Sequence, residues 1–215
     1  SLMANIGLYG GSFDPIHNGH VNAAIQMYEL LSLDELIVMP AKQSPHKSTG
    51  PNVEDHHRYE MLQIAFNDVS STMNIEISSF ELEQQSKSYT FKTIEHLKMI
   101  YPKERLYMLI GEDQLYDFDQ WKNVQMIIEN VYVVIVKRYK DSKKLDDYIS
   151  EHELFKHYEA RFIPIDIQIT EMSSTDIRDK LAHHVSVRHM LPKSVYDYIK
   201  EEHLYERKES DSINS

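Results

Sequence analysis

The sequence predicts an α/β protein built on an open parallel β-sheet. Short apolar runs alternate along the chain with longer segments of helical periodicity. A glycine pair stands where the first apolar run meets the first helical segment. Alternation of this kind favours parallel strands joined by right-handed helical crossovers. The helix returns the chain to the end of the sheet where the previous strand began, so that the next strand runs in the same direction.

The elements follow from these runs. We expect strands over residues 6–9, 35–39, 73–77, 106–110, 131–136 and 161–164. Helices are expected over residues 21–31, 53–66, 90–100, 124–129 and 144–157, and two more, over 175–182 and 193–202, form a short C-terminal helical part. The predicted fold is therefore a Rossmann-like open sheet with helices on both faces. We expect one domain over residues 3–206 and a disordered polar tail over 207–215.

The most informative segment follows the first predicted strand and reads Gly10-Gly11-Ser12-Phe13-Asp14-Pro15-Ile16-His17-Asn18-Gly19-His20. A glycine pair lets the backbone approach a bulky anion, and a helix N-terminus offers unpaired N–H groups to a phosphate. His17 and His20 are three residues apart and should point the same way on a helical turn. A glycine junction or a histidine pair alone is common in structural settings. Only their combination predicts chemistry on a phosphate.

This combination resembles the nucleotidylyltransferase superfamily, whose hallmark is a [His/Thr]-x-Gly-His turn, and within it the bacterial nicotinate-nucleotide adenylyltransferases. The second family motif, Ser-Ser-Thr-x-Ile-Arg, is matched by residues 173–178. Further matching segments, in the family's order, are Ser44-Pro45-His46-Lys47, His57-Arg58, Ser88-Tyr89-Thr90, Ile110-Gly111-Glu112-Asp113, Trp121 and the ending Tyr198-Ile199-Lys200 to Leu204-Tyr205-Glu206. The resemblance covers nearly the whole chain.

The resemblance implies an enzyme of NAD biosynthesis that transfers AMP from ATP to nicotinate mononucleotide, giving deamido-NAD and pyrophosphate. The attacking phosphate is already ionised, so the reaction needs positioning and charge stabilisation but no general base. We expect magnesium to arrive with ATP and to be held mainly by phosphate oxygens and water, with no metal-ligating residues of the protein.

The resemblance also assigns residues. The catalytic group is His17, His20 and Arg178. ATP is expected to contact these three together with Gly10, Gly11, Gly111, Asp113, Ser174 and Thr175. Nicotinate mononucleotide is expected to contact Ser12, Phe13, His46, Lys47, Thr90, Trp121 and Lys122. Other interpretations stay open: Phe13 and Trp121 are also plausible core residues, and Ser173 to Thr175 also suit an ordinary helix cap.

Two positions depart from the family pattern. Lys122 stands after Trp121, where many relatives have an aromatic residue, and we hypothesise that its ammonium group adds preference for the nicotinate acid over the amide. Residues 137–140 (Lys-Arg-Tyr-Lys) stand where relatives often show Arg-Pro-Gly, and Arg138 is expected near the adenine. The remaining histidine pairs are interpreted as surface or structural, and His57-Arg58 as bracing the fold.

Composition limits the alternatives. The 215 residues carry a formal net charge of -11 and no cysteine, which argues against a nucleic-acid binder and excludes disulfides. No apolar run is long enough to span a membrane, and the start, Ser1-Leu2-Met3-Ala4-Asn5, lacks the basic region followed by an apolar region that marks a signal peptide, so we expect a cytoplasmic protein. The resemblance makes a homodimer a possibility.

Three rival interpretations remain. Pantetheine-phosphate adenylyltransferases usually carry Thr at the position of His17, and cytidylyltransferases lack the Ser-Ser-Thr-x-Ile-Arg motif. A non-catalytic nucleotide sensor would not require His17, His20 and Arg178 together. Turnover assays with alternative substrates separate these possibilities.

Overall fold

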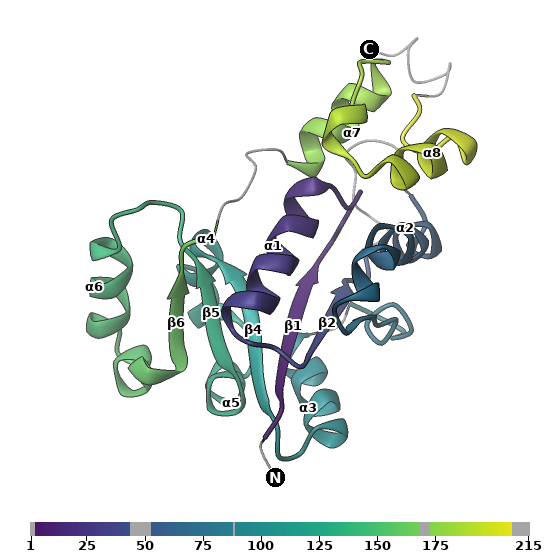
Figure 1. The fold of residues 1–215 in the computed structure, drawn as a ribbon. Coiled ribbons are helices and arrows are strands. Elements are labelled where there is room, and N and C mark those ends of the chain that lie inside the picture. The colour runs from purple at the N-terminus through teal and green to yellow at the C-terminus, as the bar shows by residue number, and fades with distance from the viewer. Residues whose placement is uncertain (1–2, 44–52, 88, 168–172, 208–215) are drawn as a thin grey trace.

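The computed structural model describes residues 3–43, 53–87, 89–167 and 173–207. Six parallel strands form one sheet in the order β3-β2-β1-β4-β5-β6 (Figure 1). They are β1 (Asn5–Gly11), β2 (Glu35–Pro40), β3 (Ile75–Ile77), β4 (Arg105–Gly111), β5 (Tyr132–Val136) and β6 (Phe162–Ile165). The predicted fold class is confirmed.

The predicted helices appear in the expected order with two corrections, and one short helix directly after β4 was not predicted. They are α1 (Asn18–Leu30), α2 (Asp55–Asn67), α3 (Thr90–Ile100), α4 (Glu112–Leu115), α5 (Val124–Asn130), α6 (Lys143–Glu151), α7 (Ser174–Ala182) and α8 (Lys193–Glu201), with 3-10 turns η1 (Val69–Ser71), η2 (Phe118–Gln120), η3 (Phe155–Arg161) and η4 (Arg188–Met190). The first helix begins at Asn18 and not at residue 21. The single helix expected over 144–157 is wrong: the chain is extended at His152, whose Nδ1 accepts hydrogen bonds from the N–H groups of Leu154 and Phe155, and η3 follows.

Helices cover both faces of the sheet, and successive strand residues supply the two cores. In β2, Leu36 and Val38 belong to a cluster shared with α1, α2, α7 and α8. Ile37 and Met39 belong to a second cluster shared with α3, α5 and α6. Because neighbouring residues of a strand point to opposite faces, the apolar run of one strand serves both cores.

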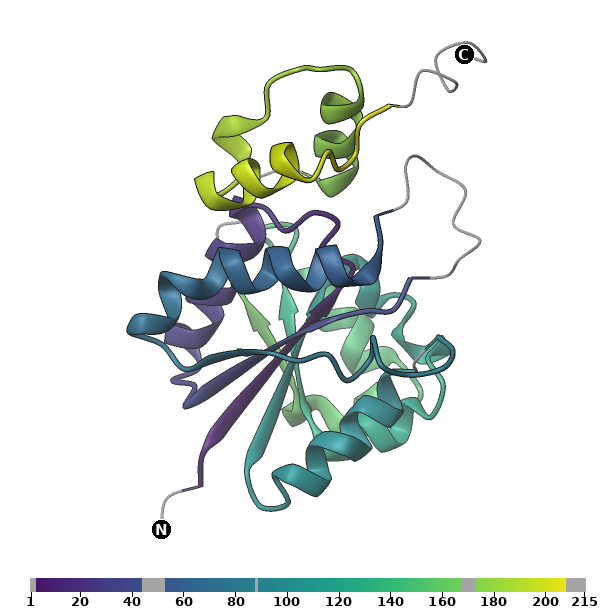
Figure 2. The ribbon, with the colours of Figure 1, turned by 90° about the vertical axis from the view of Figure 1, so that its right-hand side faces the viewer.

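The C-terminal helices continue the first of these cores. Figure 2 shows α7 and α8 lying beyond one end of the sheet, with α8 next to α2. Ile177 and Ile199 belong to the same buried cluster as Met27 of α1. A hydrogen bond of 2.8 Å between His57 Nδ1 and the Tyr198 hydroxyl links α2 to α8. This arrangement agrees with the expected bracing role of the His57 segment.

The strand order changes direction between β1 and β4. The chain adds β2 and β3 on one side of β1 and then returns to add β4, β5 and β6 on the other. In open sheets of this kind, ligands bind in the crevice beyond the carboxyl ends of the strands at this switch point. Gly11 of β1 pairs in register with Pro40, and Gly111 of β4 pairs with Val136. The segments that follow these strands therefore leave the sheet at the same end.

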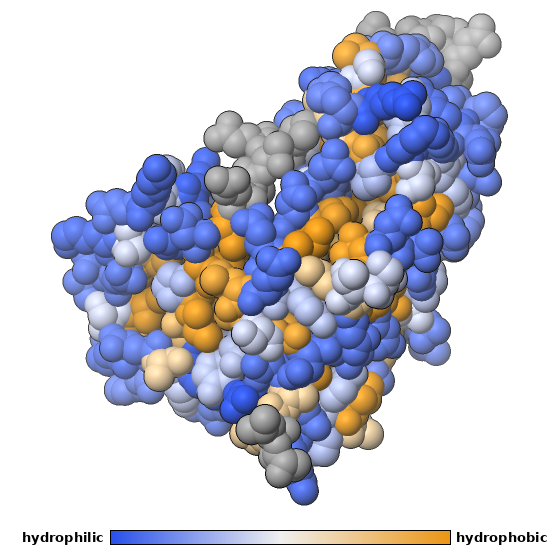
Figure 3. All heavy atoms as spheres, viewed as in Figure 1, coloured by the Kyte–Doolittle hydropathy of each residue, from blue (hydrophilic) through white to orange (hydrophobic). Residues whose placement is uncertain are grey.

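The surface is largely polar. Figure 3 shows apolar residues gathered between α1 and α6, in front of β5 and β6, where Figure 1 shows no helix over the strands. Among the described residues, no helix is both long enough and apolar enough to cross a membrane. The predicted tail, apart from Arg207, lies outside the described residues.

Candidate active site

Two histidines close the start of α1. His17 is the N-cap residue, and its Nδ1 accepts a hydrogen bond from the Gly19 N–H at 3.0 Å. In return, Nδ1 of His20 accepts from the His17 N–H at 3.1 Å. Their rings stack with centroids 3.7 Å apart. The expectation that both side chains point the same way is therefore confirmed, and the mutual capping explains the earlier start of α1.

The capping also fixes which ring nitrogen carries the proton. A neutral imidazole whose Nδ1 accepts a hydrogen bond holds its proton on Nε2. The Nε2 atoms of His17 and His20 have no hydrogen-bond partner among the described residues. Neither is fully buried, because the one fully buried side-chain nitrogen or oxygen without a partner among those residues is Arg58 Nε. Both Nε2 atoms are therefore accessible to solvent. The turn therefore presents two neighbouring N–H donors.

Both imidazoles are neutral near pH 7. Burial lowers the pKa of His17 to about 4. Burial and the neighbouring His17 lower the pKa of His20 to about 3. The pair therefore offers neutral N–H donors at that pH.

The turn between β1 and α1 lies over Phe13. This residue is 3% exposed, has a positive φ of 47°, and touches Tyr9 and His20 edge to face, with ring centroids 5.2 and 5.1 Å away. A Cβ added at Gly11 would lie 3.3 Å from the Phe13 ring, so a larger residue at position 11 would displace the Phe13 side chain. The Phe13 side chain thus packs in the core under the turn. Gly10 and Gly11 end β1 and do not form a separate loop.

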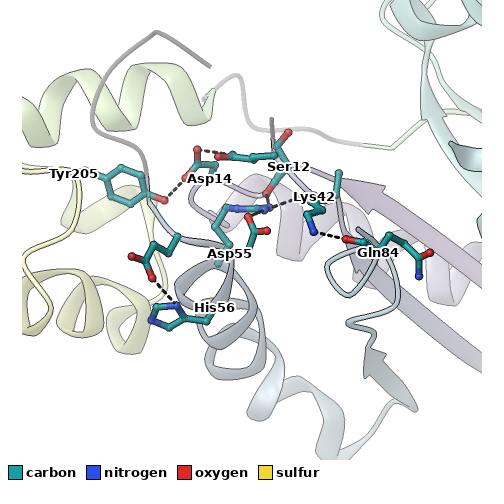
Figure 4. Close-up of polar contacts among 11 residues, drawn as sticks. Ser12, Asp14, Lys42, Asp55, His56, Gln84 and Tyr205 are labelled. Carbon is teal, nitrogen blue, oxygen red and sulfur yellow. Dashed lines mark hydrogen bonds and ion pairs between the residues drawn. The ribbon is translucent and has the colours of Figure 1, made fainter. Parts of the chain in front are cut away.

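A buried arginine holds the same turn from α2. The Arg58 side chain is fully buried and donates to the Ser12 carbonyl at 2.6 Å and to the Ala41 carbonyl at 2.7 Å. It also forms an ion pair of 2.6 Å with Asp55. Figure 4 shows Ser12 and Asp55, two residues to which this guanidinium donates, close to each other. Arg58 therefore fixes the chain after β1 relative to the chain after β2.

The second sequence motif meets the first. The Ser174 hydroxyl donates to the Pro15 carbonyl at 2.9 Å, and Arg178 Nη1 donates to the Asp14 carbonyl at 2.7 Å. Ser173 caps α7 by accepting from the Asp176 N–H, as its sequence predicted. Arg178 is the fifth residue of α7. The start of α7 is thereby tied directly to the turn that carries His17.

A cavity of about 660 Å³ opens beside the carboxyl ends of β4, β5 and β6. Its lining includes Gly111 and Asp113 from the start of α4 and Arg138 from the segment after β5. Arg138 Nη1 forms an ion pair with Asp113 at 2.7 Å, and its N–H donates to Glu112 at 2.9 Å. The residues assigned to adenosine by resemblance therefore lie together.

Thr90, Trp121 and Lys122 lie on the side of the sheet covered by α3 and α5. Thr90 begins α3, and the half-buried Trp121 packs edge to face on Phe118 with centroids 4.9 Å apart. Lys122 Nζ lies 4.8 Å from the ring centre of Tyr89, the residue before Thr90. The Thr90 and Lys122 segments are thus neighbours. His46 and Lys47 lie outside the described residues.

Sequence reasoning missed two members of this network, Asp14 and Tyr205. Asp14 is 6% exposed and accepts hydrogen bonds from Tyr205 and Gln43. Asp14 lies inside the glycine motif and Tyr205 inside the matched ending, yet nothing local to either residue indicates that they meet.

The other histidines have structural partners. His152 pairs with Asp119 at 3.1 Å, and His56 pairs with Glu54 on the surface at 3.2 Å. Within the part of the chain that the structure describes, no three His, Asp or Glu side chains are grouped so that they could hold a metal ion. Both oxygens of Asp14, the carboxylate of the turn itself, are already occupied by hydrogen-bond donors.

Residues 8–180 match the family described as cytidylyltransferase-like. A "Probable nicotinate-nucleotide adenylyltransferase" of Clostridium perfringens is 34% identical over 206 residues, which cover 95% of this chain and 100% of the relative. One of Methylacidiphilum infernorum is 33% identical over 203 residues, covering 93% and 91%. The structure of Plasmodium falciparum nicotinic acid mononucleotide adenylyltransferase complexed with NaAD is similar in fold, with a TM-score of 0.71 at 23% identity and coverage of 94% and 97%.

Proposed function

The chain belongs to the cytidylyltransferase-like family and, within it, to the nicotinate-nucleotide adenylyltransferases, and from this premise we propose how its site transfers AMP from ATP to nicotinate mononucleotide. The observation that carries the proposal is the pair of stacked histidines, whose Nδ1 atoms accept backbone hydrogen bonds and leave Nε2–H for a ligand, at the turn that Arg178 contacts from α7. Two donors and a guanidinium at the switch point of the sheet suit a phosphate chain.

The reaction is an in-line displacement at phosphorus. A phosphate oxygen of nicotinate mononucleotide attacks the α-phosphorus of ATP while the bond to the α,β-bridging oxygen breaks. Deamido-NAD forms and pyrophosphate leaves with the electron pair. The attacking oxygen is ionised at neutral pH, so the protein has to align the two nucleotides and stabilise the charge that develops on the transferred group.

The two imidazoles donate hydrogen bonds to ATP phosphate oxygens, with His20 nearest the α-phosphate. Their Nδ1 atoms are occupied by backbone N–H groups, so each ring is held in the orientation that directs Nε2–H at the substrate. Donors that are fixed before the substrate arrives require no reorganisation during the reaction. Gly10 and Gly11 let the phosphates approach the end of β1.

Arg178 and the start of α7 bind the β- and γ-phosphates. Two N–H groups of Arg178 contact the Asp14 carbonyl and the Thr175 hydroxyl. A guanidinium has five N–H donors, so others remain for the leaving pyrophosphate. Ser174 and Thr175 add backbone N–H groups from the first turn, where the helix dipole favours an anion.

The cavity beside β4 and β5 receives adenosine. The Asp113 carboxylate accepts a hydrogen bond from a ribose hydroxyl, and the Gly111 backbone permits close approach. The ion pair with Arg138 supports this role, because it holds the Asp113 carboxylate at the cavity wall. Arg138 then lies near the adenine ring.

Nicotinate mononucleotide occupies the other side of the crevice. Ser12 and Phe13 offer main-chain groups, Trp121 stacks on the pyridine ring, and Thr90 and Lys122 flank it, while His46 and Lys47 contact the mononucleotide phosphate. The closeness of Lys122 to the segment that begins α3 supports this assignment. Lys122 favours the nicotinate carboxylate over the neutral amide.

Magnesium enters as a complex with ATP, and phosphate oxygens and water supply its ligands. At the turn, each carboxylate oxygen of Asp14 already accepts a hydrogen bond, one from Tyr205 and one from Gln43, which supports phosphate and water as the main ligands of the ion. We further propose that residues 3–206 form one catalytic domain, that the enzyme is cytoplasmic and that it assembles as a homodimer. Size-exclusion chromatography with light scattering tests the dimer.

The test is pyrophosphate release from ATP and magnesium with nicotinate mononucleotide, nicotinamide mononucleotide or phosphopantetheine. We expect rapid turnover with nicotinate mononucleotide, a loss of about a hundredfold or more in His20→Ala, and no loss in His183→Ala, which removes an exposed histidine. Turnover with phosphopantetheine would assign the chain to a sibling activity. ATP binding without turnover on any acceptor would favour a nucleotide sensor.

A further inference from the structure

A tyrosine near the C-terminus reaches the turn that carries the active-site histidines. Tyr205 is 1% exposed, and its hydroxyl donates a hydrogen bond of 2.5 Å to Asp14 Oδ1 across a sequence separation of 191 residues. Figure 4 shows the Tyr205 ring directed at the Asp14 carboxylate. The contact therefore joins the end of the chain to the first motif.

The backbone around Tyr205 is arranged to make this contact. Tyr205 has a positive φ of 61°, and His203, two residues earlier, has a φ of 53°. The Leu204 N–H donates to the Ile199 carbonyl at 3.0 Å, which folds the chain back over the end of α8. Left-handed conformations are unfavourable for such residues and persist where surrounding contacts hold them. Here the buried ring and its hydrogen bond are those contacts.

Tyr205 acts as a donor under all ordinary conditions. Burial and the adjacent Asp14 carboxylate raise the pKa of its phenol well above the usual range, although the charges of Arg178 and Arg58 oppose this. The phenol stays protonated and the carboxylate accepts. A hydrogen bond of this kind, to a charged acceptor in a buried position, is stronger than one between neutral groups.

Asp14 passes this constraint to Arg178. Its Oδ1 is held by Tyr205 and its Oδ2 by Gln43 Nε2 at 2.8 Å, while its carbonyl accepts from Arg178 Nη1 at 2.7 Å. A shift of Asp14 would move the carbonyl that aligns the Arg178 guanidinium. The same residue begins the short path to His17, three positions further along the chain.

We propose that Tyr205 is a positioning residue for the transfer reaction: through Asp14 it holds Arg178 and the turn before His17 in the arrangement that the ATP phosphates require. This inference rests on the proposed function. Tyr205 touches neither substrate. It acts by fixing the side chain and the turn that do.

Tyr205→Phe removes the hydroxyl and keeps the ring. It leaves Asp14 Oδ1 buried without its donor, so the carboxylate and the Asp14 carbonyl will shift. Tyr198→Phe is the matched control. Tyr198 lies in the same C-terminal region, and its hydroxyl is hydrogen-bonded to His57 on α2, away from the turn. We expect kcat/KM for ATP to fall about tenfold in Tyr205→Phe and less than twofold in Tyr198→Phe, at a temperature where melting curves show both folded.

A double-mutant cycle tests the route through Arg178. The readout is the affinity for a non-hydrolysable ATP analogue. If Tyr205 acts through Arg178, Tyr205→Phe weakens binding in the wild-type background but by less than twofold in Arg178→Ala. Equal losses in both backgrounds, or equal activity losses in Tyr205→Phe and its control, would overturn the inference.

The two proposals fail in different ways. If the unmodified protein does not transfer AMP to nicotinate mononucleotide, the proposed function is wrong, and the inference is then judged on the binding cycle alone. If the unmodified protein is active and Tyr205→Phe matches Tyr198→Phe in both activity and analogue affinity, the function stands and the positioning role is wrong.

Discussion

The two stacked histidines make the stability of the fold depend on pH in a way that can be calculated. The perturbation is the paired substitution His17→Asn with His20→Gln. Asn is a good N-cap residue, and Gln at the third helical position can accept the return hydrogen bond, so both caps keep an acceptor. The variant therefore removes the titration and retains the hydrogen-bond geometry.

The sign follows from the two states. The pKa of His17 is about 4 and that of His20 about 3 in the folded protein, against about 6.5 in an unfolded chain. Below pH 6.5 the unfolded state therefore binds more protons than the folded state, so the free energy of unfolding decreases as the pH decreases. Stability from this source is present above pH 6.5 and is lost as the pH falls toward the folded values.

The magnitude comes from the same values. At pH 5 an unfolded histidine is almost fully protonated while these two are almost fully neutral, which corresponds to about 2 kcal/mol for each group. At pH 7 the difference is only a few tenths of a kcal/mol. Between pH 7 and pH 5 the wild type should lose up to about 4 kcal/mol more than the paired variant, a large part of the stability of an ordinary domain.

The assay is urea unfolding of both proteins at pH 7, 6 and 5 and constant ionic strength, with free energies from linear extrapolation. Carboxylates common to both proteins cancel in the difference. Imidazole NMR signals, assigned with the single variants, should remain those of the neutral form down to pH 5. Parallel stability curves for the two proteins, or imidazoles that titrate near pH 6.5, would refute the reasoning.

Two further substitutions test other parts of the site. Arg58→Met should destabilise the fold by about 3–5 kcal/mol, because it leaves Asp55 and two carbonyl groups without their buried partner; urea unfolding measures this, and a loss no larger than that of His56→Ala would contradict it. Lys122→Ala should lower the preference for nicotinate over nicotinamide mononucleotide about tenfold in kcat/KM, whereas Lys144→Ala, which also removes an ammonium group from above a tyrosine ring, should leave the ratio unchanged. An unchanged ratio in Lys122→Ala would remove the proposed role.

The strands and their order of appearance could be predicted from the sequence because parallel strands are buried on both faces. Their residues form continuous apolar runs, as in β5, where four of five residues are buried. The alternation with helices predicts that the strands are parallel, but it does not predict their order in the sheet. Which strands are neighbours depends on contacts between distant segments, and no local pattern contains them.

Helix ends were harder to predict where side chains replaced the usual signals. Histidine is not among the residues that commonly cap helices, so the start of α1 at Asn18 was not apparent. His152 ends α6 in a similar way, by accepting two backbone N–H groups. Both cases depend on a ring nitrogen that sequence patterns do not distinguish from a surface histidine.

The site residues also fall into those that local motifs predict and those that depend on long-range contacts. Motifs placed His17, His20, Ser174 and Arg178 at two strand or helix ends, and the structure brings those ends together. Asp14 and Tyr205 were missed because their role depends on a contact between the two ends of the chain. The neutral state of the histidines could not be predicted from the sequence, because burial and ring stacking appear only in three dimensions.

These observations resolve an electrostatic difficulty in the sequence. A chain with a formal net charge of -11 has to bring two anionic nucleotides together, and two imidazolium groups would have been one source of positive charge. In this fold the histidines are neutral and the charge of the buried Arg58 is paired with Asp55. Permanent positive charge at the turn therefore comes from Arg178, aided by the N-termini of α1 and α7. The histidines then contribute direction more than charge, because each Nε2–H is aimed by a backbone hydrogen bond at its other nitrogen. A bound phosphate chain would raise the pKa of both rings by its negative charge, so proton uptake on ATP binding below pH 7, measured by calorimetry in buffers of different ionisation enthalpy, should exceed that of the paired His17→Asn and His20→Gln variant.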